Sequence, residues 1–168
     1  MKSKLKPIVP LLTGPPGVGK STIIRQVAGR LGGRAGGFFT REVRVDGQRA
    51  GFEVVTLGGQ TAVLATRNPA PAFAREAALA HEQIIIVDEI GPMELFSARF
   101  YELVLQMLDR DVAVTGTIVQ RPHPLAGRVK AHPRVRLWPV TLENRDGLGE
   151  ELWAALAAGA ESGGGAGV

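Results

Sequence analysis

The sequence predicts an α/β fold, in which helices cover both faces of a mainly parallel β-sheet and form three layers. Three observations lead to this fold class. The apolar run Ile8–Thr13 ends in a glycine-rich loop that leads into a helix-compatible segment. A second run, Ile84–Val87, is continuously apolar and β-branched, as expected of a parallel strand buried on both faces. Segments of strand and helix character then alternate as far as residue 158.

The first strand should run from about Pro7 to Thr13. Pro10 lies inside it and lacks the N–H group that a central strand uses, so we expect a local bulge or an unpaired position there. The first helix should run from about Gly19 to Leu31, where Gly32-Gly33 ends it.

An antiparallel meander should follow, as an insertion of about residues 36–66 appended to the parallel core. Its first strand is Phe38–Val45, and Asp46-Gly47 is a typical hairpin turn. Two further strands, Arg49–Leu57 and Thr61–Ala65, are separated by the turn Gly58-Gly59.

The second half should complete the parallel sheet. We expect strands at Ile84–Glu89, Val112–Val119 and Val135–Thr141, and helices at Ala72–His81, Ser97–Leu108 and Arg145–Ala158, with a loop and short helix at Pro122–His132. Residues 1–158 then form a single domain. The Gly-, Ser- and Ala-rich stretch 159–168 is expected to be a disordered tail.

Composition narrows the class of protein. The chain has 168 residues, a formal net charge of +4 and no cysteine, which excludes a disulfide framework and a thiolate metal site. No apolar segment approaches membrane-spanning length, so we expect a soluble cytoplasmic protein. The basic residues are spread along the sequence and few aromatic residues accompany them, so we do not expect nucleic acid to be the partner.

The glycine-rich loop, Gly14–Ser21, fits the P-loop (Walker A) pattern without a mismatch. In such a loop, successive backbone N–H groups and the positive end of the next helix bind nucleotide phosphates. Lys20 is expected to reach the β- and γ-phosphates, and the Ser21 hydroxyl to ligate Mg²⁺. The residues expected to bind nucleotide are Gly14, Pro15, Pro16, Gly17, Val18, Gly19, Lys20, Ser21 and Thr22.

A second motif follows the run Ile84–Val87. Asp88 lies at its carboxyl end, as in a Walker B motif, and should hold Mg²⁺, through a water molecule. Glu89 comes next and is expected to polarise a water molecule that attacks the γ-phosphate. P-loop proteins with a glutamate at this position have an extra strand between the P-loop strand and the Walker B strand. We therefore expect the strand Val112–Val119 to lie between the P-loop strand and the Asp88 strand.

Further site residues were inferred from their positions. Thr115 or Thr117, near the end of that intervening strand, could sense the γ-phosphate or hold the attacking water, and we favour Thr117. Phosphoryl transfer also needs a cation on the developing charge; the candidates are Arg41, Arg44, Arg121 and Arg128, with Arg41 preferred. Asn144 either contacts the base or ribose or caps the last helix.

With these motifs in place, the chain resembles the thermophile-type nucleoside-triphosphatases, also called the cancer-related nucleoside-triphosphatases. The resemblance extends from Leu11 to about Leu152. It rests on the P-loop and on blocks specific to this family: Gly37–Arg44 with Gly51-Phe52, Val87–Leu95, Gly116–Ile118, His123-Pro124 and Val140–Asp146.

The resemblance implies slow, Mg²⁺-dependent hydrolysis of nucleoside triphosphates such as ATP and GTP to diphosphate and phosphate, with low base selectivity. It also implies a fold like that of the recombinase-type P-loop ATPases. The chain departs from the family at Pro92, where a lysine is usual, and in the stretch between Leu64 and Gln83, which is shorter.

Two other functions remain open at this point. A nucleoside or nucleotide kinase would share the P-loop and would need an acceptor pocket, for which the loop Arg121–Lys130 could act as a lid. A nucleotide-gated interaction module would use hydrolysis only to reset a switch. Glu89 favours hydrolysis over transfer to an organic acceptor.

Overall fold

The computed structural model describes residues 5–59, 61–64, 84–92 and 98–163. The predicted helix Ala72–His81 and the Met93-Glu94-Leu95 part of the family block lie outside these residues. Seven strands form one sheet: β1 (Val9–Thr13), β2 (Ala35–Val45), β3 (Gln48–Thr56), β4 (Thr61–Leu64), β5 (Ile84–Ile90), β6 (Ala113–Ile118) and β7 (Val135–Pro139). The described helices are α1 (Lys20–Leu31), a 3₁₀ turn η1 (Gly32–Arg34), α3 (Ala98–Asp109), α4 (Pro124–Lys130) and α5 (Arg145–Gly163).

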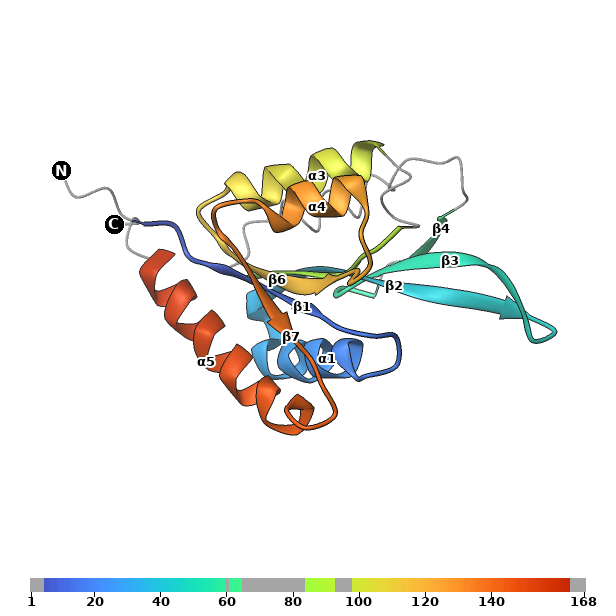
Figure 1. The fold of residues 1–168 in the computed structure, drawn as a ribbon, viewed down its shortest axis with the longest axis horizontal. Helices are drawn as coiled ribbons and strands as arrows, with labels where there is room; N and C mark the ends of the chain where they lie inside the picture. The colour runs from blue at the N-terminus through green and yellow to red at the C-terminus, as the bar shows by residue number, and fades with distance from the viewer. Residues whose placement is uncertain (1–4, 60, 65–83, 93–97, 164–168) are drawn as a thin grey trace.

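The strands lie in the order β4-β3-β2-β5-β6-β1-β7. The pairs β2–β5, β5–β6, β6–β1 and β1–β7 are parallel, and the pairs β2–β3 and β3–β4 are antiparallel. The fold class is confirmed: the sheet is mainly parallel and carries an antiparallel meander at one end (Figure 1). The expectation that β6 lies between the P-loop strand and the Asp88 strand is confirmed as well.

Strand β2 belongs to both parts of the sheet. Its first half, Ala35–Phe39, pairs in parallel with β5, and its second half pairs with β3. The hairpin turn uses Asp46 and Gly47 with φ angles of 50° and 75°, the pair of positive values that a type I′ turn requires. Figure 1 shows the far end of this hairpin extending beyond the helices. The meander therefore starts inside the core sheet rather than beside it.

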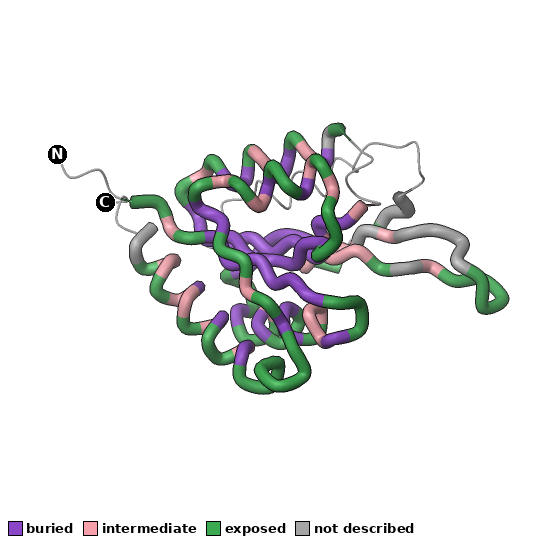
Figure 2. Tube along the Cα trace, in the orientation of Figure 1, coloured by how far each residue is buried: buried purple, intermediate pink, exposed green. Residues whose placement is uncertain are grey.

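Helices cover both faces of the sheet, with α1 and α5 on one side and α3 and α4 on the other (Figure 1). The position of β5 between these helices explains why its first four residues, Ile84–Val87, are all apolar. Ile84 and Ile86 pack in the cluster with α1 and α5, whereas Ile85 and Val87 pack in the cluster with α3 and α4. Figure 2 shows the resulting core as buried strands between half-buried helices. Alternate side chains of one strand thus bind the three layers together.

Helix α5 continues five residues beyond the predicted end at Ala158, so the expected start of a disordered tail at residue 159 was wrong for residues 159–163. The reason is packing. A Cβ atom at Gly159 would lie 3.3 Å from Cβ of Pro7 and 3.7 Å from Cβ of Ala113, so the helix passes close to β6 and the segment before β1. This contact offsets the low helix propensity of glycine.

Pro10 occupies an unpaired position on one side of β1, as expected. The ladder with β6 starts one residue later, at Leu11, while the ladder with β7 includes Pro10 opposite Arg136. The carbonyl oxygen of Pro10 accepts a hydrogen bond from the Thr115 hydroxyl, 2.8 Å away. A side chain of β6 thus replaces part of the missing backbone pairing.

Arg134 is a buried cation near the N-terminal end of β1, whereas the glycine loop follows the other end of this strand. Its guanidinium group donates to the carbonyl oxygens of Pro7 at 2.7 Å, Leu108 at 2.6 Å and Val112 at 2.7 Å. These carbonyls belong to the segment before β1, the end of α3 and the segment before β6. Arg134 therefore joins three elements, and its role is structural.

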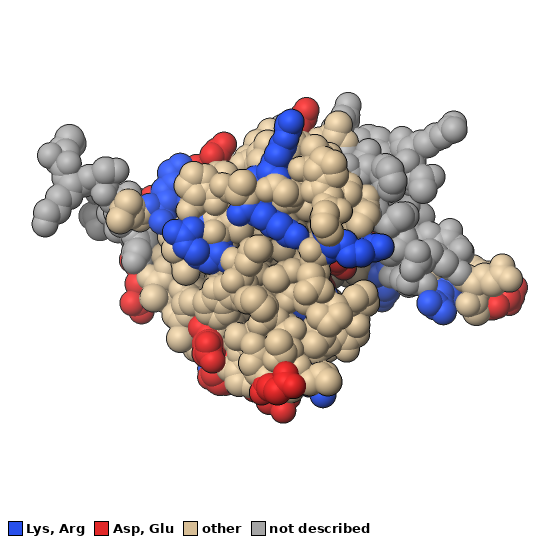
Figure 3. Space-filling view, in the orientation of Figure 1, with Lys and Arg blue, Asp and Glu red and all other residues tan. Residues whose placement is uncertain are grey.

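Charge is unevenly distributed over the surface. Between Val112 and Leu142 the sequence contains no Asp or Glu, whereas α5 and the loop before it carry Glu143, Asp146, Glu150, Glu151 and Glu161. Figure 3 shows Lys and Arg gathered over α4 and β7, with Asp and Glu over α5. The basic residues of α4 and β7 thus share one face (Figure 3). In the part of the chain that the structure describes, no helix is long and apolar enough to cross a membrane.

Candidate active site

The glycine loop joins β1 to α1 through backbone conformations that glycine adopts readily and other residues rarely adopt. Gly14, Gly17 and Gly19 have φ angles of 153°, 77° and 112°. At Gly14 a close approach also excludes a side chain, because a Cβ atom there would lie 2.8 Å from the carbonyl oxygen of Val140. The loop is therefore pressed against the segment that follows β7 and leads directly into α1.

Lys20 is the first residue of α1 and folds back over the loop. Its ammonium group donates hydrogen bonds to the carbonyl oxygens of Gly14 at 2.8 Å and Pro15 at 3.1 Å. The first turn of α1 contains no acidic residue. The loop thus presents a cation together with the unpaired N–H groups of a helix start, an arrangement that favours anions.

Asp88 lies at the carboxyl end of β5, with only 2% of its surface exposed. The hydroxyl of Ser21 donates to its Oδ1 at 3.2 Å, and the hydroxyl of Thr117 donates to the same oxygen at 2.5 Å. The sheet therefore brings together a residue of α1, one of β5 and one of β6. Two donors satisfy Oδ1 of this buried carboxylate at a place where its charge would otherwise be costly.

Glu89 follows at an irregularity of the sheet. The register between β5 and β6 shifts between Val87 and Ile90, so that Asp88 and Glu89 form a bulge. The backbone N–H of Glu89 donates to the hydroxyl of Thr40 in β2, at 3.2 Å. A bulge at a strand end interrupts the alternation of side chains, so two adjacent residues can face the same region.

Burial raises the pKa of the Glu89 carboxyl above its ordinary value of 4.5. The negative charge of Asp88 raises this pKa further, whereas the positive charge of Lys20 lowers it. The side chain is half-buried. Glu89 therefore lies within the electrostatic influence of both the P-loop lysine and the Walker B aspartate, and it is a better proton acceptor than an exposed glutamate.

The two threonines of β6 have different partners. Both are fully buried, but Thr115 donates to the carbonyl of Pro10 and Thr117 donates to Asp88. Of the two positions considered from the sequence, the structure thus brings Thr117 to the carboxylate and leaves Thr115 in the sheet.

Arg41 does not join these residues. It forms an ion pair with Glu53, its direct neighbour across the β2–β3 hairpin, and 60% of its side chain is exposed. Its Nε donates to Glu53 at 3.0 Å. Because successive strand residues point to opposite faces, Thr40 at the site implies that Arg41 points elsewhere. Arg121 and Arg128 are exposed beyond β6 and on α4.

Asn144 uses its side chain to close the loop after β7. Its Oδ1 accepts from the backbone N–H of Thr141 at 2.8 Å, and its Nδ2 donates to the carbonyl of Pro139 at 2.8 Å. The Thr141 hydroxyl accepts from the N–H of Asn144 at 3.2 Å. The amide therefore binds residues before it rather than the N–H groups of α5.

Two residues near the site were missed by the sequence analysis. Thr40 contacts the backbone of Glu89, and Arg145 lies against the loop at Gly19. Both stand inside the family-specific blocks, one residue before Arg41 and one after Asn144. That position was the only available signal, because neither residue type identifies a site by itself.

The residues present fit a magnesium ion. The oxygens of Ser21 and Asp88 meet at the start of α1, and hard oxygen donors are the ligands that Mg²⁺ prefers. Among the described residues, no group of three or more His, Cys, Asp or Glu side chains could hold a metal ion. Mg²⁺ suits such a sparse site because it keeps waters and takes further ligands from phosphates.

This fold and site define a P-loop nucleotide-binding protein: a strand, a glycine loop and a helix that place Lys20 over the loop and bring Ser21 to a buried aspartate two strands away. The NTPase family model matches residues 10–153. The chain belongs to the NTPase family.

Similar proteins carry the same name. The nucleoside-triphosphatase THEP1 of Thermotoga petrophila is 38% identical over 87% of this chain and 91% of its own length. The mouse cancer-related nucleoside-triphosphatase homolog is 34% identical over 86% of this chain and 94% of its own.

Two solved structures are similar in fold. The crystal structure of THEP1 from the hyperthermophile Aquifex aeolicus has a TM-score of 0.71 and 34% identity, over 89% of this chain and 99% of that one. The solution structure of a human cancer-related nucleoside triphosphatase has a TM-score of 0.72 and 31% identity, over 92% of this chain and 98% of that one.

Proposed function

We propose that this protein hydrolyses nucleoside 5′-triphosphates to diphosphate and phosphate, slowly, with Mg²⁺ and with little selectivity for the base. The observation that carries the proposal is the pair Asp88-Glu89 near the end of β5. The positive charge of Lys20 acts on the Glu89 carboxylate. The names of the relatives support the same activity. Asp88 would help to hold the metal, and Glu89 would accept a proton from the attacking water.

The glycine loop binds the phosphates. Its backbone N–H groups and the start of α1 attract the polyphosphate, and Lys20 exchanges its bonds to the carbonyls of Gly14 and Pro15 for bonds to the β- and γ-phosphates. The lysine needs only a change of rotamer for this exchange, because it already lies over the loop.

Ser21 and Asp88 would hold the metal, Ser21 directly and Asp88 through a water molecule. When bound, Mg²⁺ neutralises charge on the β- and γ-phosphates. Thr117 fixes the Asp88 carboxylate by its hydrogen bond to Oδ1 and thereby orients it toward α1.

Glu89 activates the nucleophile. Its carboxylate accepts a proton from a water molecule as the water oxygen bonds to the γ-phosphorus, and the bond from that phosphorus to the bridging oxygen breaks. The nucleoside diphosphate leaves with the bridging oxygen. Thr40 keeps the backbone of Glu89 in place during this step.

Substitution of Glu89 tests the proposal. Glu89→Gln keeps the size of the side chain but cannot accept the proton, so phosphate release from ATP and GTP should fall at least about 100-fold. Nucleotide binding should persist. Glu102→Gln, an exposed position on α3, is the matched control and should keep the parent activity.

Three outcomes would contradict the proposal. Undiminished phosphate release by Glu89→Gln would remove the role of this carboxylate. No phosphate release by the parent with Mg²⁺ from any of the common triphosphates would remove the activity. Labelled γ-phosphate found on an added nucleoside or nucleotide, instead of free in solution, would favour a kinase.

A further inference from the structure

The loop after β7 lies against the P-loop on the side away from the two carboxylates. The backbone N–H of Val140 donates to the carbonyl of Thr13 at 2.8 Å, which ties this loop to the end of β1. In the sheet, β6 and β5 lie on one side of β1 and β7 lies on the other. A triphosphate whose last phosphate is near Glu89 must therefore extend its nucleoside toward the β7 side.

Asn144 is not free to bind that nucleoside. Both ends of its amide are engaged within the loop, by Thr141 and by Pro139. A ligand would have to break these bonds, and the loop would lose its closure. The next residue is the alternative.

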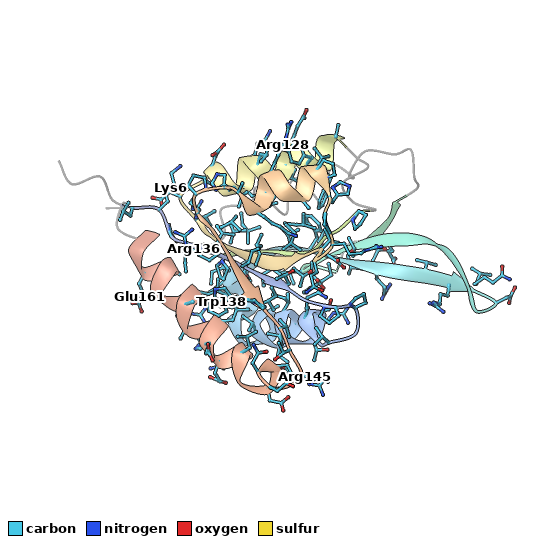
Figure 4. The ribbon with its side chains drawn as sticks, in the orientation of Figure 1. Lys6, Arg128, Arg136, Trp138, Arg145 and Glu161 are labelled. Carbon is cyan, nitrogen blue, oxygen red and sulfur yellow. The ribbon has the colours of Figure 1, made fainter. Side chains whose placement is uncertain are left out.

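The side chain of Arg145, the first residue of α5, reaches the P-loop. A Cβ atom at Gly19 would lie 3.7 Å from Cδ of Arg145, and the Nη1 atom donates to the carbonyl of Val18 at 3.5 Å. The side chain is 44% exposed, and its Nε lies 3.9 Å from Asp146. Figure 4 labels Arg145 where α5 begins, close to the end of α1 that follows the loop. The aliphatic part thus lies against the loop, and the guanidinium group makes only a long hydrogen bond and a long ion pair and stays partly exposed to a ligand.

We propose that Arg145 binds the nucleoside end of the triphosphate, with its guanidinium plane against the face of the base. A guanidinium group stacks on any base because every base has a π face. This contact explains how one site takes several triphosphates, since no hydrogen-bonding edge of the base is read. The inference rests on the proposed function, because it places the γ-phosphate at Glu89.

Inorganic tripolyphosphate distinguishes a contact with the base from a contact with the phosphates, because it has the phosphates of ATP and no base. Binding is measured by calorimetry with Mg²⁺ in the Glu89→Gln background, in which hydrolysis of the ligand should be slow. Adding Arg145→Ala should weaken ATP and GTP binding about 5- to 30-fold, a range set by the strength of cation–π contacts. Tripolyphosphate binding should not change.

Two further variants sharpen the experiment. Arg145→Lys keeps the charge and loses the plane, so ATP should still bind more weakly than to the Glu89→Gln parent. Arg30→Ala removes an exposed arginine from the far end of α1 and should change neither ligand. Equal weakening of ATP and tripolyphosphate by Arg145→Ala would overturn the proposal, since it would show that Arg145 only braces the loop or binds phosphate. Unchanged ATP binding would overturn it as well.

The proposed hydrolysis and this inference fail separately. If the protein with Glu89 intact releases no phosphate from ATP, the hydrolysis is wrong. The difference between ATP and tripolyphosphate in binding then still decides whether Arg145 contacts the base.

Discussion

The hydroxyl of Thr117 donates a hydrogen bond to Oδ1 of Asp88 across 2.5 Å, and both side chains are buried. This bond joins β6 to β5 at the point where the sheet meets the P-loop. Because Ser21 donates to the same oxygen, the orientation of one carboxylate depends on residues of three elements. The register of β6 against β5 therefore decides how the proposed metal ligand is aimed.

Thr117→Val should weaken the response to magnesium. The change keeps the shape of the side chain but removes the donor to Asp88, so the Mg²⁺ concentration for half-maximal phosphate release should rise about tenfold. The free energy of unfolding should fall by about 1–2 kcal/mol, since a buried carboxylate loses a partner. Magnesium titrations of activity and urea unfolding measure the two effects.

Thr115→Val is the control for this prediction. It is the same substitution, two residues away in the same strand, and it removes a bond to the carbonyl of Pro10. It should cost about 1 kcal/mol of unfolding free energy and leave the magnesium response unchanged. A magnesium response that is the same for both variants would contradict the role of Thr117.

The raised pKa of Glu89 should make this residue a source of instability at neutral pH. In the folded protein its pKa lies above the ordinary value of 4.5 because burial and Asp88 disfavour the charged form. The folded state therefore holds this proton more tightly than the unfolded chain, so stability is lost as pH rises from 4.5 through the folded pKa. The glutamine of Glu89→Gln does not ionise, so this variant should not lose stability for this reason as pH rises.

Urea unfolding of metal-free protein at pH 4, 6 and 8 measures this effect. The free energy of unfolding of Glu89→Gln minus that of the parent should increase from pH 4 to pH 8. The exposed variant Glu102→Gln reports the general effect of removing a negative charge. A difference for Glu89→Gln that stays constant or decreases with pH would contradict the assigned cause.

Gly116 should not accept a side chain. It lies opposite Val87 in β5, and a Cβ atom there would be 1.8 Å from the carbonyl oxygen of Val87. Gly116→Ala would force β6 away from β5 just before the Asp88-Glu89 bulge. We expect a loss of about 3 kcal/mol or more in unfolding free energy, with a lower yield of soluble protein.

Gly29→Ala is the matched control. Gly29 lies in α1 and faces open space, so alanine should stabilise the helix by up to about 1 kcal/mol. Urea unfolding midpoints compare the two variants with the parent. A Gly116→Ala protein with a midpoint equal to that of the parent would show that the strands can separate without cost.

Most of the fold was predictable because its strands, helices and turns depend on residues that are adjacent in the sequence. The apolar run of β5, the turn at Asp46-Gly47 and the P-loop each depend on neighbours in the chain. The error at the end of the last helix has a non-local cause. Glycine and alanine near residue 159 suggested disorder, and the helix persists there because it packs on Pro7 and Ala113, which lie far away in the sequence.

The candidate site was predicted less completely. Lys20, Ser21, Asp88 and Glu89 belong to short motifs whose residue spacing reflects their shared chemistry, so these residues could be named directly. Arg41 was a candidate for the cation because it lies in the predicted strand Phe38–Val45. Its ion pair with Glu53 depends on the pairing of β2 with β3, and the sequence does not show which of the two faces of β2 turns toward the site.

The chain alone therefore specified the elements, their order and the residues proposed to carry the phosphate chemistry, because hydrophobic periodicity and motif spacing are local properties. The tertiary structure decided which distant residues meet. Thr117 contacts Asp88 across 29 positions of sequence, Ser21 contacts Asp88 across 67, and Arg145 contacts Val18 across 127. Such contacts follow from strand register, the bulge at Asp88-Glu89 and helix packing, which minimise the free energy of the whole fold rather than of any one segment.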